Sequence, residues 1–183
     1  TYGVQNAFMA SSGFSFAHEF SRSSFTHEGC SFMSYSEAST WREQNSNKKI
    51  VFTNGCFDIL HPGHVSYLNE AKSLGDLLVI GLNSDSSVKR IKGEDRPVNS
   101  EADRSFMLKN LKSVDQVFIF NEDTPYELIK ALAPDVLVKG GDWRPEQIVG
   151  SDIVLARGGE VKSLSFIVGH STSSIISKVQ GRS

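Results

Sequence analysis

From residue 48 onward, apolar positions alternate between short continuous runs and runs with helical spacing. The run 77–82 is typical of a strand buried on both faces of a sheet. Val65, Leu68 and Ala71 instead recur at the spacing of one helix face. The same criteria predict strands at 50–53, 77–82, 114–120, 136–138 and, with a weaker pattern, 160–164. They predict helices at 62–74, 101–112, 125–132 and 171–179.

This alternation predicts one doubly wound, Rossmann-like α/β domain with a parallel sheet of about five strands. In such sheets ligands bind beyond the carboxyl ends of the strands, at the topological switch point. Residues that carry chemistry should therefore follow the strands directly. They do so after the first, second and fourth predicted strands.

The first 47 residues lack this pattern, being rich in Ser and Phe and free of Leu and Ile. Such a stretch can bury little as a unit. We expect an irregular or flexible extension over 1–47 and a single domain over 48–183. Docking of its Phe residues on a hydrophobic groove is the alternative.

Composition limits the partners. The net charge of −2 gives no general attraction to nucleic acid or to anionic membranes, so neither is expected as a partner. No apolar run approaches the roughly 20 residues of a membrane span. Two cysteines, Cys30 and Cys56, make no disulfide framework, which fits a reducing cytoplasm.

The first predicted strand runs directly into a phosphate-type turn. Gly55 lets the backbone expose N–H groups to an anion, and Pro62 suits the first turn of a helix. A helix N-terminus carries partial positive charge and unpaired donors, so it favours phosphate. His61 and His64 can converge there and donate hydrogen bonds to phosphoryl oxygens.

Zinc binding and a purely structural role are the alternatives for this histidine pair. The remaining histidines, His18, His27 and His170, offer no third ligand at a helpful spacing, so we favour phosphate chemistry. We interpret Cys56 as a packing residue, because direct displacement at phosphorus needs no covalent intermediate.

Further polar residues follow the second strand. Asn83 and Asp85 end it at the same edge of the sheet as the histidines. We expect Lys89, Arg90 and Lys92 to lie in a mobile loop that closes over a polyphosphate. A solvated basic face is the alternative, and it is strongest for Arg90.

The last two junctions also suit a nucleotide. Gly140 and Gly141 permit a close backbone approach to a bulky ligand, and Asp142 can accept a hydrogen bond from a sugar hydroxyl. An ordinary tight turn is the alternative. The hydroxyl-rich stretch 171–174 can cap the last helix, bind an anion, or do both.

These residues resemble a known superfamily. The segment 53–58, followed by His61-Pro62-Gly63-His64, is similar to the His-x-Gly-His signature of the cytidylyltransferase-like nucleotidyltransferases. Over residues 48–180 the chain resembles one branch in particular, the D-glycero-β-D-manno-heptose 1-phosphate adenylyltransferases. The blocks that carry this resemblance are 81–88, Lys92-Gly93 with Arg96-Pro97, 123–125, 139–142 and 171–176.

The resemblance implies a reaction between ATP and heptose 1-phosphate that gives ADP-heptose and pyrophosphate. It implies Mg²⁺ held on the triphosphate rather than by the protein alone, and a cytoplasmic enzyme that supplies heptose for bacterial lipopolysaccharide. Many relatives carry a sugar kinase ahead of this domain, so we expect a separate heptose kinase. We also expect a homo-oligomer. Ser173 stands where the family more usually has Thr.

The motifs and the resemblance together define the expected site. The catalytic residues expected are His61, His64, Lys89 and Lys92. The nucleotide and phosphate ligands expected are Thr53, Asn54, Gly55, Cys56, Phe57, Gly63, Arg104, Lys139, Gly140, Asp142, Ser171, Thr172 and Ser173. The residues expected near the sugar phosphate are Asp58, Asn83 and Asp85.

The expected mechanism is an in-line attack of the sugar 1-phosphate on the α-phosphorus of ATP, without a general base. The nearest alternative is the same chemistry with CTP and glycerol 3-phosphate or another alcohol phosphate. A catalytically silent nucleotide-binding module is an alternative of another class. An aminoacyl-tRNA synthetase fragment is disfavoured, because the chain is short and lacks a basic surface.

Overall fold

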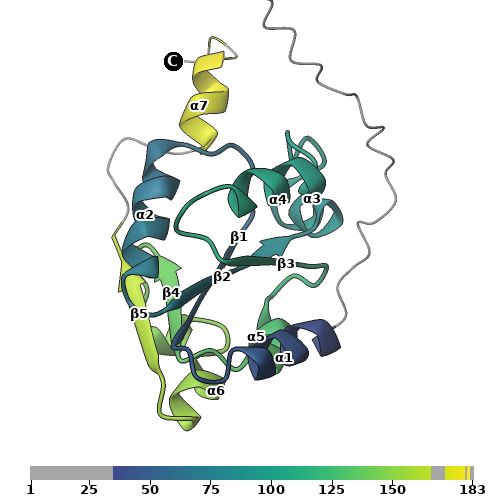
Figure 1. Cartoon of the computed structure of the whole chain (residues 1–183). Coiled ribbons are helices and arrows are strands. Elements are labelled where there is room, and N and C mark those ends of the chain that lie inside the picture. Colours follow the sequence, from purple (N-terminus) through teal and green to yellow (C-terminus); the bar gives the residue numbers. More distant parts are fainter. Residues whose placement is uncertain (1–34, 166–171, 180, 182–183) are drawn as a thin grey trace, which may run out of the picture. The chain divides into compact units, whose positions relative to one another are not determined.

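The computed structural model describes residues 35–165, 172–179 and 181, and it contains a five-stranded sheet in which every pairing is parallel (Figure 1). The strand order is β3-β2-β1-β4-β5. The strands are β1 (Ile50–Gly55), β2 (Leu77–Asn83), β3 (Gln116–Phe120), β4 (Val136–Gly140) and β5 (Glu160–Leu164). The predicted doubly wound α/β fold is confirmed.

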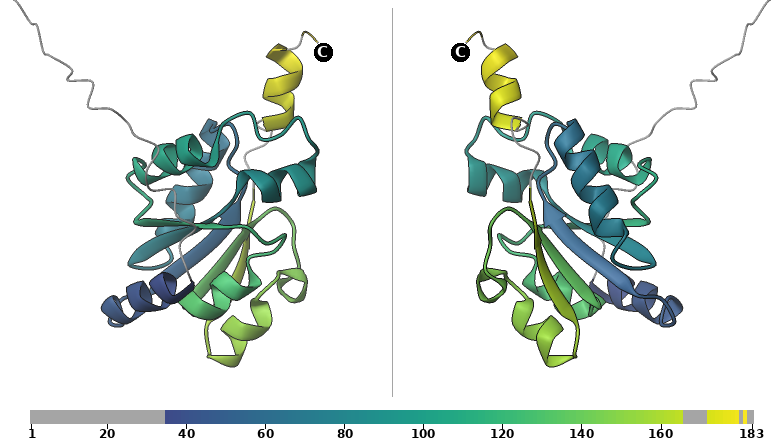
Figure 2. Two further views of the ribbon diagram at one scale, coloured as in Figure 1. Left: turned by 90° about the vertical axis from the view of Figure 1, so that its right-hand side faces the viewer. Right: turned by 90° about the vertical axis from the view of Figure 1, so that its left-hand side faces the viewer.

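Helices cover both faces of this sheet (Figure 2). One face carries α2 (Pro62–Lys72) and α4 (Glu101–Lys109), and the other carries α1 (Tyr35–Gln44), α5 (Tyr126–Leu132) and α6 (Ser151–Ala156). The remaining elements are α3 (Asp85–Lys92), the short η1 (Pro145–Gln147) and α7 (Thr172–Val179). None of the helices in the described ranges is both long and apolar enough to cross a membrane.

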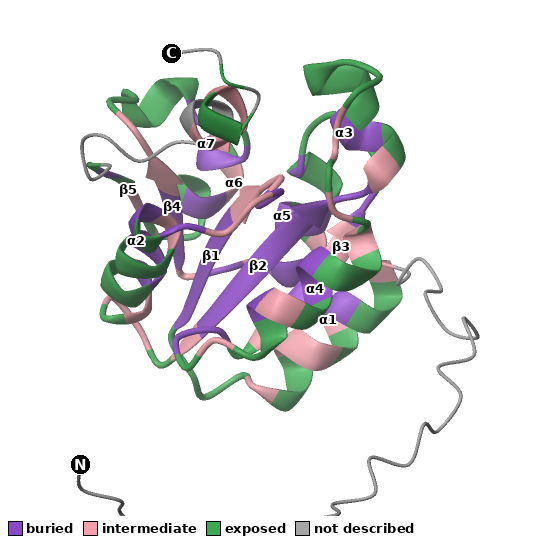
Figure 3. Ribbon diagram, turned by 90° about the horizontal axis from the view of Figure 1, so that it is seen from above, coloured by how far each residue is buried: buried purple, intermediate pink, exposed green. Residues whose placement is uncertain are grey.

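The core is split into two apolar layers by the alternation of side chains along each strand. In β1, Val51 faces the layer under α2 and α4, whereas Ile50 and Phe52 face the layer under α1 and α5. In β2, Leu78 and Val79 divide in the same way. The central strands are consequently buried on both sides, as the purple ribbons in Figure 3 show.

The strand order places the switch point between β1 and β4. β1 pairs with β2 on one side and with β4 on the other. After β1 the chain builds one half of the sheet with β2 and β3, and after that it builds the other half with β4 and β5. Ligands of doubly wound sheets bind just beyond this point. Two of the predicted motifs, after Gly55 and after Gly140, follow these two strands.

Two expectations about helices are wrong. The segment 35–44 lies within the stretch expected to be irregular, yet it forms α1 and packs on α5 through the hydrogen bond from Ser39 Oγ to the Ala131 carbonyl (3.2 Å). The segment expected to be a basic loop forms α3, with Ser84 as its N-cap and Gly93 after its last turn. Local capping compensates in α3 for the scarcity of apolar residues.

Candidate nucleotide-binding site

A cavity of about 470 Å³ lies beyond the carboxyl ends of the central strands. It brings together segments from six parts of the chain, including the β1–α2 turn, the end of α3 and the first residue of α7. The lining residues are Asn54, Gly55, Cys56, Phe57, Asp58, His64, Asn83, Ile91, Lys92, Arg96, Asp123, Lys139 and Thr172. The predicted convergence of the histidine turn, the lysine segment and the start of the last helix is therefore observed.

His61 caps the N-terminus of α2 and fixes the position of His64. The backbone N–H of His64 donates to Nδ1 of His61 at 3.3 Å, so a neutral His61 carries its proton on Nε2. The two rings are stacked, with centroids 3.8 Å apart and planes at 21°. Pro62 at the first helical position and the buried Gly63 leave the helix amides close to the cavity.

His64 is a neutral imidazole at physiological pH. Burial and the neighbouring His61 lower its pKa to about 4, and the backbone of Ile59 offsets part of this shift. Its Nδ1 is buried and makes no hydrogen bond of normal geometry with the described residues. A neutral imidazole has one N–H to donate and carries no charge, and the His64 ring lines the cavity.

Phe57 also packs against the His64 ring, with the two ring planes tilted by 58°. The centroids of these rings are 5.2 Å apart, and Phe57 has the positive φ of 45° that non-glycine residues rarely adopt. A Cβ on Gly55 would lie only 3.0 Å from Phe57 Cε2, so Gly55 makes room for this ring. Such local strain is characteristic of functional turns.

Two lysines line the cavity, Lys139 from strand β4 and Lys92 from the end of helix α3. Lys139, near the end of β4, donates from Nζ to Asn54 Oδ1 at 3.1 Å, a bond that bridges β4 and β1 across the switch point. Burial lowers the pKa of Lys139, Cys56 raises it and Lys92 lowers it. No carboxylate of the described residues forms an ion pair with Lys139 or Lys92.

Cys56 lies between these cations, half-buried at the cavity wall. Burial raises the pKa of its thiol, although Lys92, Arg104 and Arg96 favour the thiolate. A thiol whose pKa is raised stays protonated near neutral pH, which suits a packing role better than that of a nucleophile.

Asp58 is buried and holds the 96–99 loop against the cavity. Its carboxylate accepts from Arg96 Nε (2.6 Å) and from the backbone N–H groups of Val98 (2.8 Å) and Asn99 (3.0 Å). With these three donors in place, the structure gives Asp58 the role of orienting a loop. Arg96 itself lines the cavity, although the sequence singled it out only as part of a family block.

Arg104 does not line the cavity. Its guanidinium is fully buried and donates to Asp85 Oδ1 and to two backbone carbonyls, those of Cys56 and Asn99. The sequence placed Arg104 near phosphates, and the structure instead places it beneath the site, with Asp85 as its partner.

The remaining expected residues divide between the cavity and other surroundings. Thr53 is buried and bonds to Tyr67 of α2 (2.6 Å), and Asn83, at the end of β2, lines the cavity and donates to Ser87. Lys89 is exposed on α3 outside the cavity lining, as is Asp142 beyond β4. Gly140 accepts from the Trp143 indole (3.1 Å).

At α7, Thr172 lines the cavity and donates weakly to the Ile59 carbonyl (3.4 Å). Ser171 lies outside the described residues, as does the side chain of Ser173. Asp123 is a lining residue that the sequence did not select, and it pairs with Arg90 Nε at 2.8 Å. Its only sequence signal was its place in the 123–125 block before a helix.

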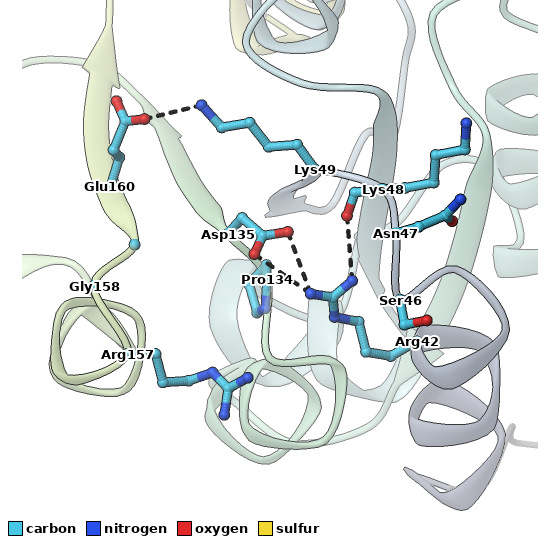
Figure 4. Close-up of a pocket in the computed structure, with 11 residues that line it drawn as sticks. Arg42, Ser46, Asn47, Lys48, Lys49, Pro134, Asp135, Arg157, Gly158 and Glu160 are labelled. Atoms are coloured by element: carbon cyan, nitrogen blue, oxygen red, sulfur yellow. Dashed lines mark hydrogen bonds and ion pairs between the residues drawn. The ribbon is translucent and has the colours of Figure 1, made fainter.

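A second hollow, of about 460 Å³, lies at the opposite, amino ends of β1, β4 and β5 (Figure 4). Its carboxylates already have partners: Asp135 accepts from Arg42 and the Ile50 N–H, and Glu160 pairs with Lys49 at 2.9 Å. Because ligands of doubly wound sheets bind at the carboxyl ends, the cavity at His64 is the candidate site.

Within the described ranges, no three or more His, Cys, Asp or Glu side chains are grouped to hold a metal ion. The donor set of the cavity is instead cationic and polar, which suits an anionic ligand. A doubly wound sheet with a cavity lined by lysines at its switch point is typical of one class of protein, the nucleotide-binding α/β domains.

Comparison with known families matches residues 52–176 to the family described as cytidylyltransferase-like. This stretch covers more than half of the chain, and the chain belongs to the cytidylyltransferase-like family. The resemblance expected from the His-x-Gly-His segment is confirmed.

Individual relatives agree with this assignment. The chain is 57% identical over 144 residues to the bifunctional protein HldE of Wolinella succinogenes, covering 79% of this chain and 29% of that protein. It is 59% identical over 135 residues to the bifunctional protein HldE of Marinomonas sp., covering 74% and 28%. The chain thus spans less than a third of the length of these relatives.

Solved structures show the same fold. A lipopolysaccharide core biosynthesis protein from Thermoplasma volcanium matches with a TM-score of 0.53 and 30% identity, over 66% of this chain and 97% of that one. A pantoate-beta-alanine ligase from Francisella tularensis matches with a TM-score of 0.53 over 80% of this chain and 75% of that one. Its 14% identity supports a likeness of fold alone.

Proposed function

We propose that this domain transfers the adenylyl group of ATP to D-glycero-β-D-manno-heptose 1-phosphate, forming ADP-heptose and releasing pyrophosphate. The proposal is supported by the ordered motif blocks and by the family. It is further supported by the high identity to HldE proteins and by the likeness to a protein of lipopolysaccharide core biosynthesis.

One observation carries the proposal: the cavity holds two lysines, Lys92 and Lys139, that form no ion pair with a carboxylate of the described residues. Lys139 is half-buried, and its one hydrogen-bond partner among the described side chains is the neutral amide of Asn54. A buried cation without a partner is costly unless a ligand supplies the opposite charge. Lys92 and the N-terminus of α2 face the same space. A triphosphate and a sugar phosphate together supply the missing negative charge.

In the proposed reaction an oxygen of the sugar 1-phosphate attacks the α-phosphorus of ATP. The new O–P bond forms as the bond to the β-phosphate oxygen breaks, and pyrophosphate leaves from the opposite side. The attacking oxygen is already ionised, so catalysis rests on positioning and on stabilising charge. His64 donates to the phosphoryl oxygens, while Lys92 and Lys139 neutralise the charge of the phosphates.

Mg²⁺ enters this scheme with the substrate, as MgATP. The cavity carboxylates Asp58 and Asp123 are engaged by arginines, so the triphosphate itself is the natural carrier of the ion. We also propose a cytoplasmic, homo-oligomeric enzyme fed by a heptose kinase. Exposed apolar side chains such as Phe106 (62%) and Val98 (60%) offer surface for self-association, which sedimentation velocity tests.

The test is a pyrophosphate-release assay over a panel of nucleotides and phosphorylated acceptors. We expect turnover with MgATP and heptose 1-phosphate, and much slower turnover with CTP or with glycerol 3-phosphate. Preference for CTP and glycerol 3-phosphate would instead establish the cytidylyltransferase alternative. Nucleotide binding without turnover on any acceptor would indicate a silent module.

The matched variant is His64→Ala. Loss of one donor to the developing charge of the transition state costs about 10²–10³ in kcat in comparable sites. We expect a loss of this order with the circular dichroism spectrum unchanged. Near-normal turnover by this variant would count against the mechanism.

A further inference from the structure

Arg104 is the largest of the fully buried side chains. It lies on α4, and all three of its guanidinium nitrogens donate to protein acceptors: Nη2 to Asp85 Oδ1 (2.7 Å), Nη1 to the Cys56 carbonyl (2.5 Å) and Nε to the Asn99 carbonyl (3.0 Å). Burying an unpaired charge costs much free energy. The complete set of partners around Arg104 therefore indicates that its guanidinium is held in a fixed position.

The three acceptors belong to the three segments that form one side of the cavity. The Cys56 carbonyl lies in the turn that leads to the histidines, one residue before the Phe57 ring that packs on His64. Asp85 is the first residue of α3, and Lys92, its last residue, lines the cavity. Asn99 lies in the loop that follows α3. Arg104 therefore joins the histidine turn to the helix that carries Lys92.

A second ion pair, whose carboxylate is buried, holds the same two segments together further along the chain. Asp58, in the histidine turn, binds Arg96 at 2.6 Å, four residues beyond Lys92. Asp85 thus anchors the start of the 85–96 stretch, and Arg96 anchors its end. By contrast, the Arg90–Asp123 pair on the outer side of α3 is exposed and so contributes little.

We propose that Arg104 is a positioning residue, which sets Lys92 at the correct distance from the histidine pair without contacting substrate. The proposal rests on the adenylyl transfer proposed above, because it assumes that Lys92 acts on the phosphates. The planar fork of an arginine suits this position, since a lysine ammonium cannot reach three acceptors that lie in separate segments.

The proposal makes a specific claim about coupling: Arg104 acts through Lys92. We therefore expect Arg104→Lys to lower kcat at least about tenfold in the wild-type background, a size typical of coupled sites. In a Lys92→Met background the same Arg104→Lys change should cost about twofold or less, because the group that it positions is already gone. Equal losses in the two backgrounds would overturn the proposal, whether they arise from a direct phosphate contact or from general destabilisation.

Two further variants keep the test decisive. Lys109→Met removes an exposed cation from the last turn of the same helix, and it should leave kcat unchanged. If Arg104→Lys does not fold, Asp85→Asn breaks the same link from the α3 side, and it should show the same dependence on Lys92. A loss of kcat in Asp85→Asn that persists in full in the Lys92→Met background would reject the idea.

Failure of the proposed reaction is recognised separately. Wild-type protein is assayed first, and no pyrophosphate release with MgATP and heptose 1-phosphate would refute that reaction alone. The double-variant cycle is then measured on the Kd for MgATP, because Lys92 faces the triphosphate whichever acceptor is used. Non-additive changes in this Kd support the positioning role, and additive changes reject it.

Discussion

His61 and His64 differ in what their nitrogens already do. Nδ1 of His61 is used within the protein as an acceptor for the His64 N–H, whereas Nδ1 of His64 is buried without such a bond to the described residues. Stacking at 3.8 Å also makes two positive charges unfavourable. The pair therefore presents a neutral His64 ring at the cavity wall, with the His61 ring stacked against it.

The lowered pKa of His64 predicts how stability depends on pH. In the unfolded chain this group titrates near the ordinary value of 6.5, and in the folded protein near 4. Above pH 6.5 both states are neutral and the full stability is present. As the pH falls from 6.5 through 4, the unfolded chain takes up a proton that the folded protein does not, so the free energy of unfolding decreases.

We expect His64→Gln to make this decrease shallower between pH 6.5 and 4, as measured by urea unfolding at a series of pH values. Glu160 serves as an internal reference, because Lys162 and Lys49 lower its pKa to about 2. Its contribution to the free energy of unfolding is therefore lost only below pH 4.5, in the variant as in wild type. Parallel profiles for wild type and variant between pH 6.5 and 4 would show that His64 does not titrate as described.

Lys139 allows a second prediction at the level of one residue. Lys139→Met removes a half-buried cation whose counter-ion is proposed to be the substrate. Hydrogen bonds to charged groups contribute about 1.5–3 kcal/mol, so we expect kcat/KM to fall by about 10- to 100-fold. The melting temperature should stay the same or rise, because an unpaired buried charge is gone. A lower melting temperature with unchanged kcat/KM would mean that Lys139 is structural.

Sequence alone could identify the residue types of the site but not which of them are already satisfied within the protein. Arg104 and Asp58 carry the charge and the position expected of ligands, yet most of their partners lie 19 to 48 residues away in the sequence. Such pairings depend on tertiary packing, which no local pattern records. The places of His64 and Lys139 at the cavity were predictable, because His64 lies in the first turn of the helix after β1 and Lys139 lies at the carboxyl end of β4.

Among the elements, α3 shows which signals outweigh periodicity. It has few apolar residues, so hydrophobic spacing predicted a loop. Its ends nevertheless carry the usual marks of a helix: Ser84 as N-cap, Asp85 in the first turn, basic residues in the last turn and Gly93 after it. α1 is also polar and carries fewer of these marks, with Glu37 in its first turn and Arg42 in its last. Its packing on α5 decides its structure.

The strand β2 carries a glycine that its packing requires. A Cβ on Gly81 would lie 2.7 Å from Phe52 Cζ and 3.2 Å from Leu128 Cδ2, in the layer between the sheet and α5. Overpacking of a core typically costs about 1–3 kcal/mol. We expect Gly81→Ala to lower the free energy of unfolding by this amount in urea, with the Kd for MgATP unchanged. Wild-type stability would mean that Phe52 moves aside freely.

At the scale of the whole molecule, one end of the sheet forms the cavity and the other end joins the strands to α1. The carboxyl ends of β1 and β4 form the cavity, and the amino ends are tied together by Asp135, which accepts from the Ile50 N–H (2.7 Å) and from Arg42 of α1. The alternation of strands and helices was enough to predict the sheet, but not this tie. α1 therefore belongs to the packed domain, and the boundary expected after residue 47 falls too late.

Two shortened chains test where the packed domain begins. A chain of residues 35–183 keeps α1, and a chain of 48–183 removes it together with the buried Ala38 and the edge-to-face contact of Trp41 with Phe118 (6.1 Å). Loss of a packed Trp typically costs about 3–5 kcal/mol, so we expect the shorter chain to unfold at markedly lower urea. Its Kd for MgATP, measured where it is still folded, should match that of the longer chain, because α1 packs at the end of the sheet away from the cavity. Equal urea midpoints for the two chains would show that the packed domain begins at residue 48.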